Sequence, residues 1–116
     1  MDSAELVNID GRELAKLIAT KTLSPVEVMA GYIERITRLN PNLNAYITVC
    51  HEEAMAAAKE AERQVMGNES LGPLHGLPLS VKDQFDTAGV LTTSGSTILE
   101  RYIPKDDATS IARAKE

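Results

Sequence analysis

Residues 73–89 read PLHGLPLSVKDQFDTAG and contain the most informative pattern in this chain. Within them, residues 77–82 alternate apolar and other side chains, which is typical of a short strand. The run ends in Lys82, directly before a turn. A lysine at the end of a strand is usually exposed to solvent. The first question is therefore whether Lys82 has a chemical role or is an ordinary surface lysine.

The strand pattern places Lys82 on the same face as Ser80, whereas Asp83 points to the other face. If the lysine face is buried, desolvation lowers the pKa of the ammonium group. A neutral amine can then take a proton from a hydroxyl group, which is how a serine nucleophile is activated. The alternative is a solvent-exposed lysine paired with Asp83 or Asp86, and spacing alone favours this alternative.

Upstream of this stretch, the pattern is mostly helical. A helix is predicted over residues 11–21 from apolar residues at helical spacing. A second helix is predicted over residues 25–39, because Ser24 is a favourable N-cap. Asn40 and Pro41 are expected to end this helix, since the residue before a proline disfavours helical geometry.

Two further elements follow before the central stretch. Residues 43–50 alternate and predict a half-buried strand, and residues 51–66 are rich in the best helix formers. Near the end of the chain, Asp107 is predicted to cap a helix that starts near Ala108. This helix reaches Glu116 without a stop signal, so the chain is expected to be truncated.

The order of these elements predicts an α/β fold. Two short strands, at residues 43–50 and 77–82, make a poor sheet by themselves, so further strands are expected from a larger protein. Residues 1–116 are accordingly interpreted as an N-terminal fragment of one domain.

Composition narrows the class of protein. The chain has 116 residues and a formal net charge of −5, which argues against a nucleic-acid or anionic-membrane partner. No segment approaches the length of a transmembrane helix, and the acidic N-terminus does not resemble a signal peptide. A single cysteine, Cys50, cannot form an internal disulfide, so the cytoplasm is the expected compartment.

Other candidate groups are more simply explained as structural. The hydroxyls near Gly95 fit a polar turn better than a substrate site; they belong to Thr92, Thr93, Ser94, Ser96 and Thr97. Cys50 and His51 are adjacent, but catalytic pairs usually come from different elements. His75 has no second histidine at ligand spacing, so no metal site is expected. The aspartates are expected in turns and caps; they are Asp83, Asp86, Asp106 and Asp107.

The longer stretch GPLHGLPLSVKDQFDTAGVLTTSGS, residues 72–96, resembles the first conserved block of the amidase signature family. That block reads approximately G-P-L-H-G-I-P-[IV]-x-[VL]-K-D-x-x-D-x-x-G, followed by T-T-x-G-S. The resemblance extends over essentially the whole chain, through LSPVEVMAGYIERITRLNPNLNAYITV, EAMAAAKEAE and YIPKDDATSIARAKE. It implies the N-terminal part of the amidase-signature fold, in which helices pack around a mixed sheet.

The resemblance also implies a mechanism. Enzymes of this family hydrolyse or transfer amides through a Ser–cis-Ser–Lys triad, and Lys82 matches the triad lysine, the general base. The bridging serine and the nucleophile belong to a block beyond Glu116. The 116-residue chain alone is therefore expected to be inactive and poorly stable. No cofactor is implied.

Three functions stay open. The first is an amidase that converts a small carboxylic amide to an acid and ammonia or an amine. The second is the A subunit of a glutamine-dependent aminoacyl-tRNA amidotransferase, which would bring a nucleic-acid partner. Gln84 and Gly95 depart from that branch, which usually has Asn and Cys or Ala there, and favour the first. The third is a short non-catalytic binding or assembly module. The substrate amide, the substrate-binding residues and the oligomeric state, including a homodimer, stay open too.

Overall fold

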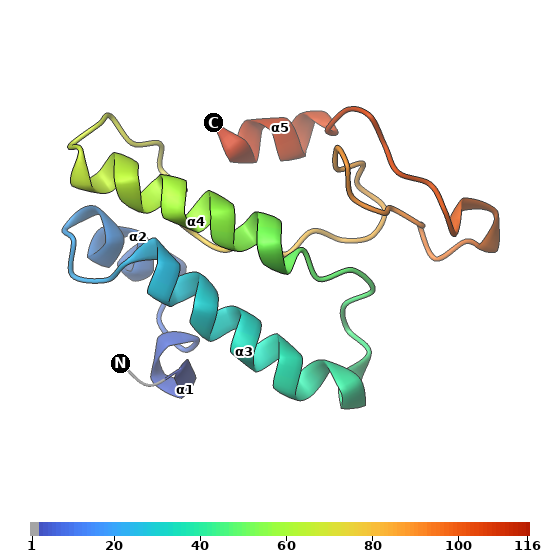
Figure 1. The fold of residues 1–116 in the computed structure, drawn as a ribbon, viewed down its shortest axis with the longest axis horizontal. Coiled ribbons are helices and arrows are strands. Elements are labelled where there is room, and N and C mark those ends of the chain that lie inside the picture. Colours follow the sequence, from blue (N-terminus) through green and yellow to red (C-terminus); the bar gives the residue numbers. More distant parts are fainter. Residues whose placement is uncertain (1–2) are drawn as a thin grey trace. The chain divides into compact units, whose positions relative to one another are not determined.

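A computed structural model describes residues 3–116 (Figure 1). Its helices are α1 (Ser3–Leu6), α2 (Gly11–Ala19), α3 (Pro25–Leu43), α4 (His51–Met66), the 3₁₀ helix η1 (Thr97–Leu99) and α5 (Thr109–Lys115). The chain divides into two compact units. The first unit comprises the residues up to Tyr46 together with Cys50–Pro78, and the second comprises Ile47–Val49 with Leu79–Glu116.

In the first unit, helices begin where capping side chains satisfy free backbone N–H groups. The Asp10 carboxylate accepts a hydrogen bond from the Arg12 N–H at 2.9 Å. Ser24 and Glu27 form a complete capping box at the start of α3. Such caps stabilise a helix by about 1 kcal/mol each, so both predicted helix starts follow from local chemistry.

The end of α3 requires a correction, because this helix continues through Pro41 to Leu43 rather than ending at residue 39. The last turn is held by Asn44, whose N–H donates to the Asn40 carbonyl at 2.7 Å. The Asn40 side chain also bonds both backbone groups of Tyr46, at 2.9 and 3.1 Å. These bonds offset the one N–H that proline lacks.

The core of the first unit joins the four helices α1 to α4. Its most buried side chains are Leu14, Ile18 and Val28, at 2%, 1% and 0% exposure. Figure 1 shows α3 and α4 side by side, and Val65 of α4 belongs to the same cluster. Burial of each such side chain contributes about 1.5–3 kcal/mol, so the helical pairing rests on this apolar contact.

The PLHG turn packs onto this core. Gly76 has a φ of +76°, and a Cβ there would lie 3.1 Å from Pro25 Cγ and 3.2 Å from Ile18 Cγ2. His75 Nε2 lies 2.9 Å from the Ala61 carbonyl, which can only accept, so Nε2 carries the proton. Because of the positive φ and the close approach of Pro25 and Ile18, the turn needs glycine at position 76.

The structure does not confirm the two predicted strands. Across residues 3–116, neither 43–50 nor 77–82 forms a strand; Leu43 instead ends α3. A strand needs a neighbour for its backbone N–H and C=O groups, and the described chain provides none. Most apolar side chains of the two segments predicted as strands are exposed, with Ile47 at 62% and Leu79 at 58%, whereas Leu77 packs against the core of the first unit.

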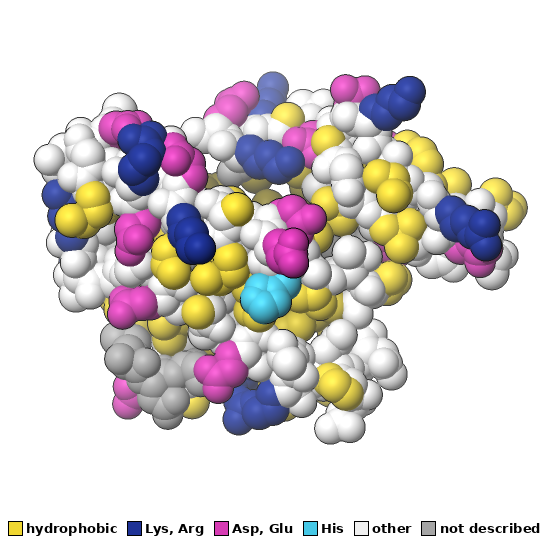
Figure 2. All heavy atoms as spheres, in the orientation of Figure 1, with side chains coloured by type: hydrophobic (Ala, Val, Ile, Leu, Met, Phe, Trp, Pro, Cys, Tyr) yellow, Lys and Arg dark blue, Asp and Glu magenta, His cyan; other side chains and the backbone are white. Residues whose placement is uncertain are grey.

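The second unit is organised mainly by backbone and polar hydrogen bonds. Gly89 N–H donates to the Pro104 carbonyl at 3.0 Å, and Thr92 N–H donates to the Tyr102 carbonyl at 2.9 Å. Large apolar side chains are exposed here: Ile47, Val49, Leu79, Val81, Phe85, Ile98, Tyr102 and Ile103. Figure 2 shows hydrophobic side chains open to solvent among the charged ones. Because little apolar surface is buried, the polar bonds largely hold this unit together.

The start of α5 lies next to the predicted position near Ala108, but its cap differs from the prediction. Its N-cap is Ala108, whose N–H donates to the Asp86 carbonyl at 2.8 Å. Asp107 does not cap the helix; its carboxylate accepts from the Ala88 N–H and from Lys115 Nζ, both at 2.7 Å. The prediction failed because a contact 19 residues away in sequence competes with the local cap.

None of the helices among the described residues is long and apolar enough to span a membrane.

Candidate active site

Lys82 begins a tight turn in the second unit. Its carbonyl accepts hydrogen bonds from the N–H groups of Gln84 at 2.7 Å and Phe85 at 3.1 Å. The side chain is exposed, and within residues 3–116 its ammonium group forms no hydrogen bond or ion pair. The alternative in which Lys82 pairs with Asp83 or Asp86 is therefore not supported, since both carboxylates bind other groups.

Asp83 makes the densest set of contacts beside Lys82. Its Oδ1 accepts from the Thr93 N–H at 2.8 Å, and its Oδ2 accepts from the Thr93 hydroxyl. Its backbone carbonyl accepts from the Ser94 N–H at 2.6 Å. We name this set of contacts between Asp83 and residues 93–94 the Asp83 clasp. Sequence reasoning missed it, although both ends lie in the motif that carries the family resemblance.

The partner of Asp83 is a four-residue turn. The Ser96 N–H donates to the Thr93 carbonyl at 2.8 Å, and the two central residues have positive φ, 51° at Ser94 and 67° at Gly95. Two positive φ values are typical of a type I′ turn. The Gly95 N–H donates to the Thr93 hydroxyl at 3.2 Å.

Two of the remaining hydroxyls of this segment also make local bonds. The Thr92 hydroxyl donates to the Val90 carbonyl at 3.1 Å, and the Ser96 hydroxyl accepts from the Ile98 N–H at 3.2 Å. Both side chains thus satisfy nearby backbone groups. This arrangement favours the polar-turn interpretation of the hydroxyl cluster over a substrate site.

The clasp lowers the pKa of Asp83. The largest cause is the hydrogen bond from the Thr93 hydroxyl, followed by the one from the Thr93 N–H, and both favour the ionised carboxylate. A lowered pKa means that the contribution of the clasp to stability is fully present above the ordinary aspartate value of 3.8. It is lost as the pH falls through the lower pKa of the folded protein.

We expect the Thr93 amide hydrogen to stay protected from solvent exchange at pH 4 and to lose that protection as the pH falls below the ordinary aspartate range. Hydrogen exchange measured by NMR or mass spectrometry across this range tests the expectation. The Thr93→Val substitution removes the main cause of the lowered Asp83 pKa. In this variant the amide hydrogen of residue 93 should lose its protection at a higher pH than in the unchanged protein. Identical pH profiles for both proteins would contradict the assignment.

Two other carboxylates of the second unit, those of Asp86 and Asp107, are structural as well. Asp86 Oδ2 accepts from the Tyr102 hydroxyl at 3.1 Å, which raises the pKa of Tyr102. The pKa of Asp107 is lowered, first by Lys115 and then by the Ala88 N–H. Both carboxylates thus bind structural groups, although Asp107 does not form the helix cap predicted for it.

Cys50 does not have the properties of a nucleophile. Burial, and then the charge of Glu53, raise the pKa of its thiol, which disfavours the reactive thiolate. His75 bonds a helix carbonyl, as described above. Within residues 3–116, no group of three or more His, Cys, Asp or Glu side chains is placed to hold a metal ion.

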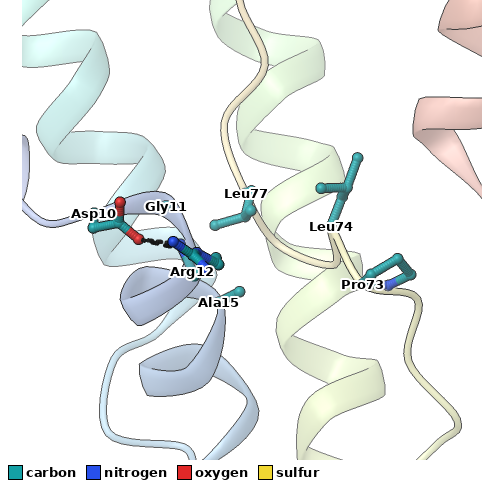
Figure 3. A pocket seen from close by; sticks show the side chains of 7 residues that line it. All are labelled: Asp10, Gly11, Arg12, Ala15, Pro73, Leu74 and Leu77. Atoms are coloured by element: carbon teal, nitrogen blue, oxygen red, sulfur yellow. Dashed lines mark hydrogen bonds and ion pairs between the residues drawn. The ribbon is translucent and has the colours of Figure 1, made fainter.

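The first unit contains a surface hollow of about 530 Å³ (Figure 3). Its lining joins the start of α2 with the PLHG turn; it consists of Asp10, Gly11, Arg12, Ala15, Pro73, Leu74 and Leu77. Asp10 already caps α2, and Arg12 is an exposed cation 3.9 Å from it. The hollow therefore offers no free nucleophile or base, and Lys82 stays the candidate.

Comparison with known proteins agrees with the motif. The model of the family described as Amidase matches residues 27–116, which include Lys82 and the Asp83 clasp. The chain belongs to the amidase family.

Curated relatives are similar over nearly the whole chain. The A subunit of the glutamyl-tRNA(Gln) amidotransferase from Carboxydothermus hydrogenoformans is 39% identical over 112 residues, 97% of this chain and 23% of that protein. The protein of the same name from Geobacter metallireducens is 41% identical over 112 residues, with the same coverage. The chain thus spans less than a quarter of the length of these relatives.

The fold of the chain also matches part of a solved structure. It is described as "An unexpected vestigial protein complex reveals the evolutionary origins of an s-triazine catabolic enzyme" and matches with a TM-score of 0.87 at 30% identity. The match covers 92% of this chain and 24% of that one. The chain therefore folds like part of an amidase-fold protein, although the sheet is not formed within residues 3–116.

Proposed function

We propose that this chain contributes Lys82 as the proton-transferring base of an enzyme that cleaves carboxylic amide C–N bonds. The observation that carries the proposal is the position of Lys82. In the resemblance described above, Lys82 takes the place of the triad lysine, and it lies within the segment that the family model covers. The turn of residues 82–85 and the Asp83 clasp give the lysine a defined backbone position.

The proposed reaction begins when a serine outside this chain attacks the amide carbonyl carbon. The serine proton passes through a bridging serine to neutral Lys82, and the C–N bond then breaks as the leaving nitrogen takes a proton. An acyl-enzyme forms, and water releases the acid while the serine regains its proton. Each proton taken up by Lys82 is returned, so the lysine is regenerated in every cycle.

A neutral lysine needs a dry environment, because desolvation is what disfavours its charged form. Lys82 is exposed within residues 3–116. We assign the residues that would bury Lys82, the nucleophile and the oxyanion donors to further parts of a longer protein. The same longer protein would provide partner strands for residues 43–50 and 77–82, so that the whole chain belongs to one amidase-signature domain.

A second candidate is the A subunit of a tRNA-dependent amidotransferase. It is favoured by the curated relatives from Carboxydothermus hydrogenoformans and Geobacter metallireducens, which bear that name. Gln84 and Gly95 favour the stand-alone hydrolase instead. The two candidates share the role of Lys82 and differ in the source and fate of the nitrogen.

The test is an ammonia-release assay on the complete protein with L-glutamine, propionamide and benzamide. A stand-alone amidase should hydrolyse at least one simple amide without any partner. An amidotransferase component should copurify with partner subunits and release ammonia from glutamine in their presence. A complete product of 116 residues that folds cooperatively and releases no ammonia would support the non-catalytic module and overturn the proposal.

A further inference from the structure

We propose that Asp83 is a positioning residue for Lys82 and acts through the hydroxyl and N–H of Thr93. The inference deepens the proposed function and rests on it, because it assumes that Lys82 is the base. Asp83 would never touch the substrate. Its task is to hold the backbone on which the lysine stands.

The first argument is geometric. Asp83 is joined to residues 93 and 94 by three hydrogen bonds, two through its carboxylate and one through its carbonyl. Directly before Asp83, the carbonyl of Lys82 accepts a hydrogen bond from the Phe85 N–H at 3.1 Å. The backbone that follows the lysine Cα is thus restrained at two successive residues.

The second argument concerns the lysine side chain. A lysine stem is flexible and its ammonium group has no preferred plane, so its direction depends on the position of its backbone. Within residues 3–116, no hydrogen bond or ion pair orients the Lys82 amine. The fixed element near the amine is therefore the backbone, and the Asp83 clasp is what fixes it.

The third argument is the burial of Thr93. This residue is 8% exposed, and its hydroxyl both donates to Asp83 and accepts from the Gly95 N–H. Removal of the carboxylate would leave a buried hydroxyl and a buried N–H without their partner. In a unit with few buried apolar side chains, such a loss should move the turn and with it the lysine.

The test measures kcat, KM and the folded fraction in the complete enzyme, with L-glutamine or whichever simple amide it hydrolyses. We expect Asp83→Asn and Thr93→Val each to lower kcat by about 10–100-fold with KM within about twofold, because misplacement of a catalytic group by about 1 Å costs on that order. Thr93→Ser keeps the hydroxyl and should restore most of the rate. The double variant should be no slower than the worse single variant, since both remove one interaction.

Asp86→Asn is the matched control, because Asp86 lies in the same unit and its carboxylate bonds only Tyr102 among the described residues. It should change kcat by less than about threefold. Losses in Asp83→Asn and Thr93→Val that equal this control, or that multiply in the double variant, would overturn the inference. If Asp83→Asn unfolds, Thr93→Val is compared alone, and a normal kcat there overturns it too.

Failure of the proposed function would look different. In that case Lys82→Ala would retain its rate, whatever the effect of the Asp83 and Thr93 variants. If Lys82→Ala is inactive while both clasp variants keep normal kcat, only the positioning role is wrong. The two proposals can therefore fail separately.

Discussion

Substitution of Lys82 by alanine in the complete enzyme is expected to lower kcat/KM for amide cleavage by about 10⁴-fold, because general-base catalysis and the activated serine depend on the same amine. Folding should be little affected, since the Lys82 side chain is exposed and makes no bond within residues 3–116. The measurement is steady-state kinetics combined with a thermal melt.

Two further variants separate the chemistry of Lys82 from its charge. Lys82→Arg keeps the positive charge, but a guanidinium group stays protonated and cannot act as a base. This variant should therefore be nearly as inactive as the alanine variant. Lys105→Ala removes another exposed lysine of the second unit and should keep nearly normal activity. A Lys82→Ala enzyme with the rate of the Lys105→Ala control would exclude Lys82 as the base.

The largest effect on stability is expected from Gly76→Ala. The positive φ of +76° costs an L-residue about 1–2 kcal/mol. The new methyl group would also meet Pro25 and Ile18 at 3.1 and 3.2 Å. A proline ring and a branched side chain in the core cannot easily move aside, which adds about 1–3 kcal/mol. The free energy of unfolding should fall by about 2–5 kcal/mol, measured by urea denaturation.

Two other glycines serve as controls for Gly76. Gly89 has a φ of +74° but no atom within 4 Å of an added Cβ, so Gly89→Ala should show the backbone cost of about 1–2 kcal/mol alone. Gly11 has open space and begins α2, so Gly11→Ala should be neutral or slightly stabilising. Equal losses for Gly76→Ala and Gly89→Ala would show that the contact with the core contributes nothing.

The helices illustrate how far local sequence reasoning reaches. The predicted range 51–66 coincides with α4 because Ala, Glu and Lys favour a helix whatever packs beside it. The start of α3 was predictable because the Ser24 cap involves neighbours in sequence. The end of α3 was not, because the side chain of Asn40 bonds the Tyr46 backbone and the helix continues through Pro41 to Leu43.

The strands show the opposite case. An alternating pattern at residues 43–50 and 77–82 reports which faces are apolar, but a strand forms only when another backbone lies beside it. Within residues 3–116 that neighbour is absent, and most apolar side chains of these segments stay exposed, Leu77 excepted. A pattern of side chains cannot provide the missing hydrogen-bond partners.

The candidate site shows the same difference between what the local sequence indicates and what only the folded chain provides. Residues 72–96 by themselves indicate the family and single out Lys82, because the motif is dense and local in the chain. The partner of Asp83 lies ten residues away, beyond a loop, and only the folded chain shows that its carboxylate binds Thr93 rather than Lys82. The sequence alone therefore identifies Lys82 as the candidate base. Only folding brings together the groups that hold its backbone, because hydrogen bonds between distant residues depend on the path of the backbone.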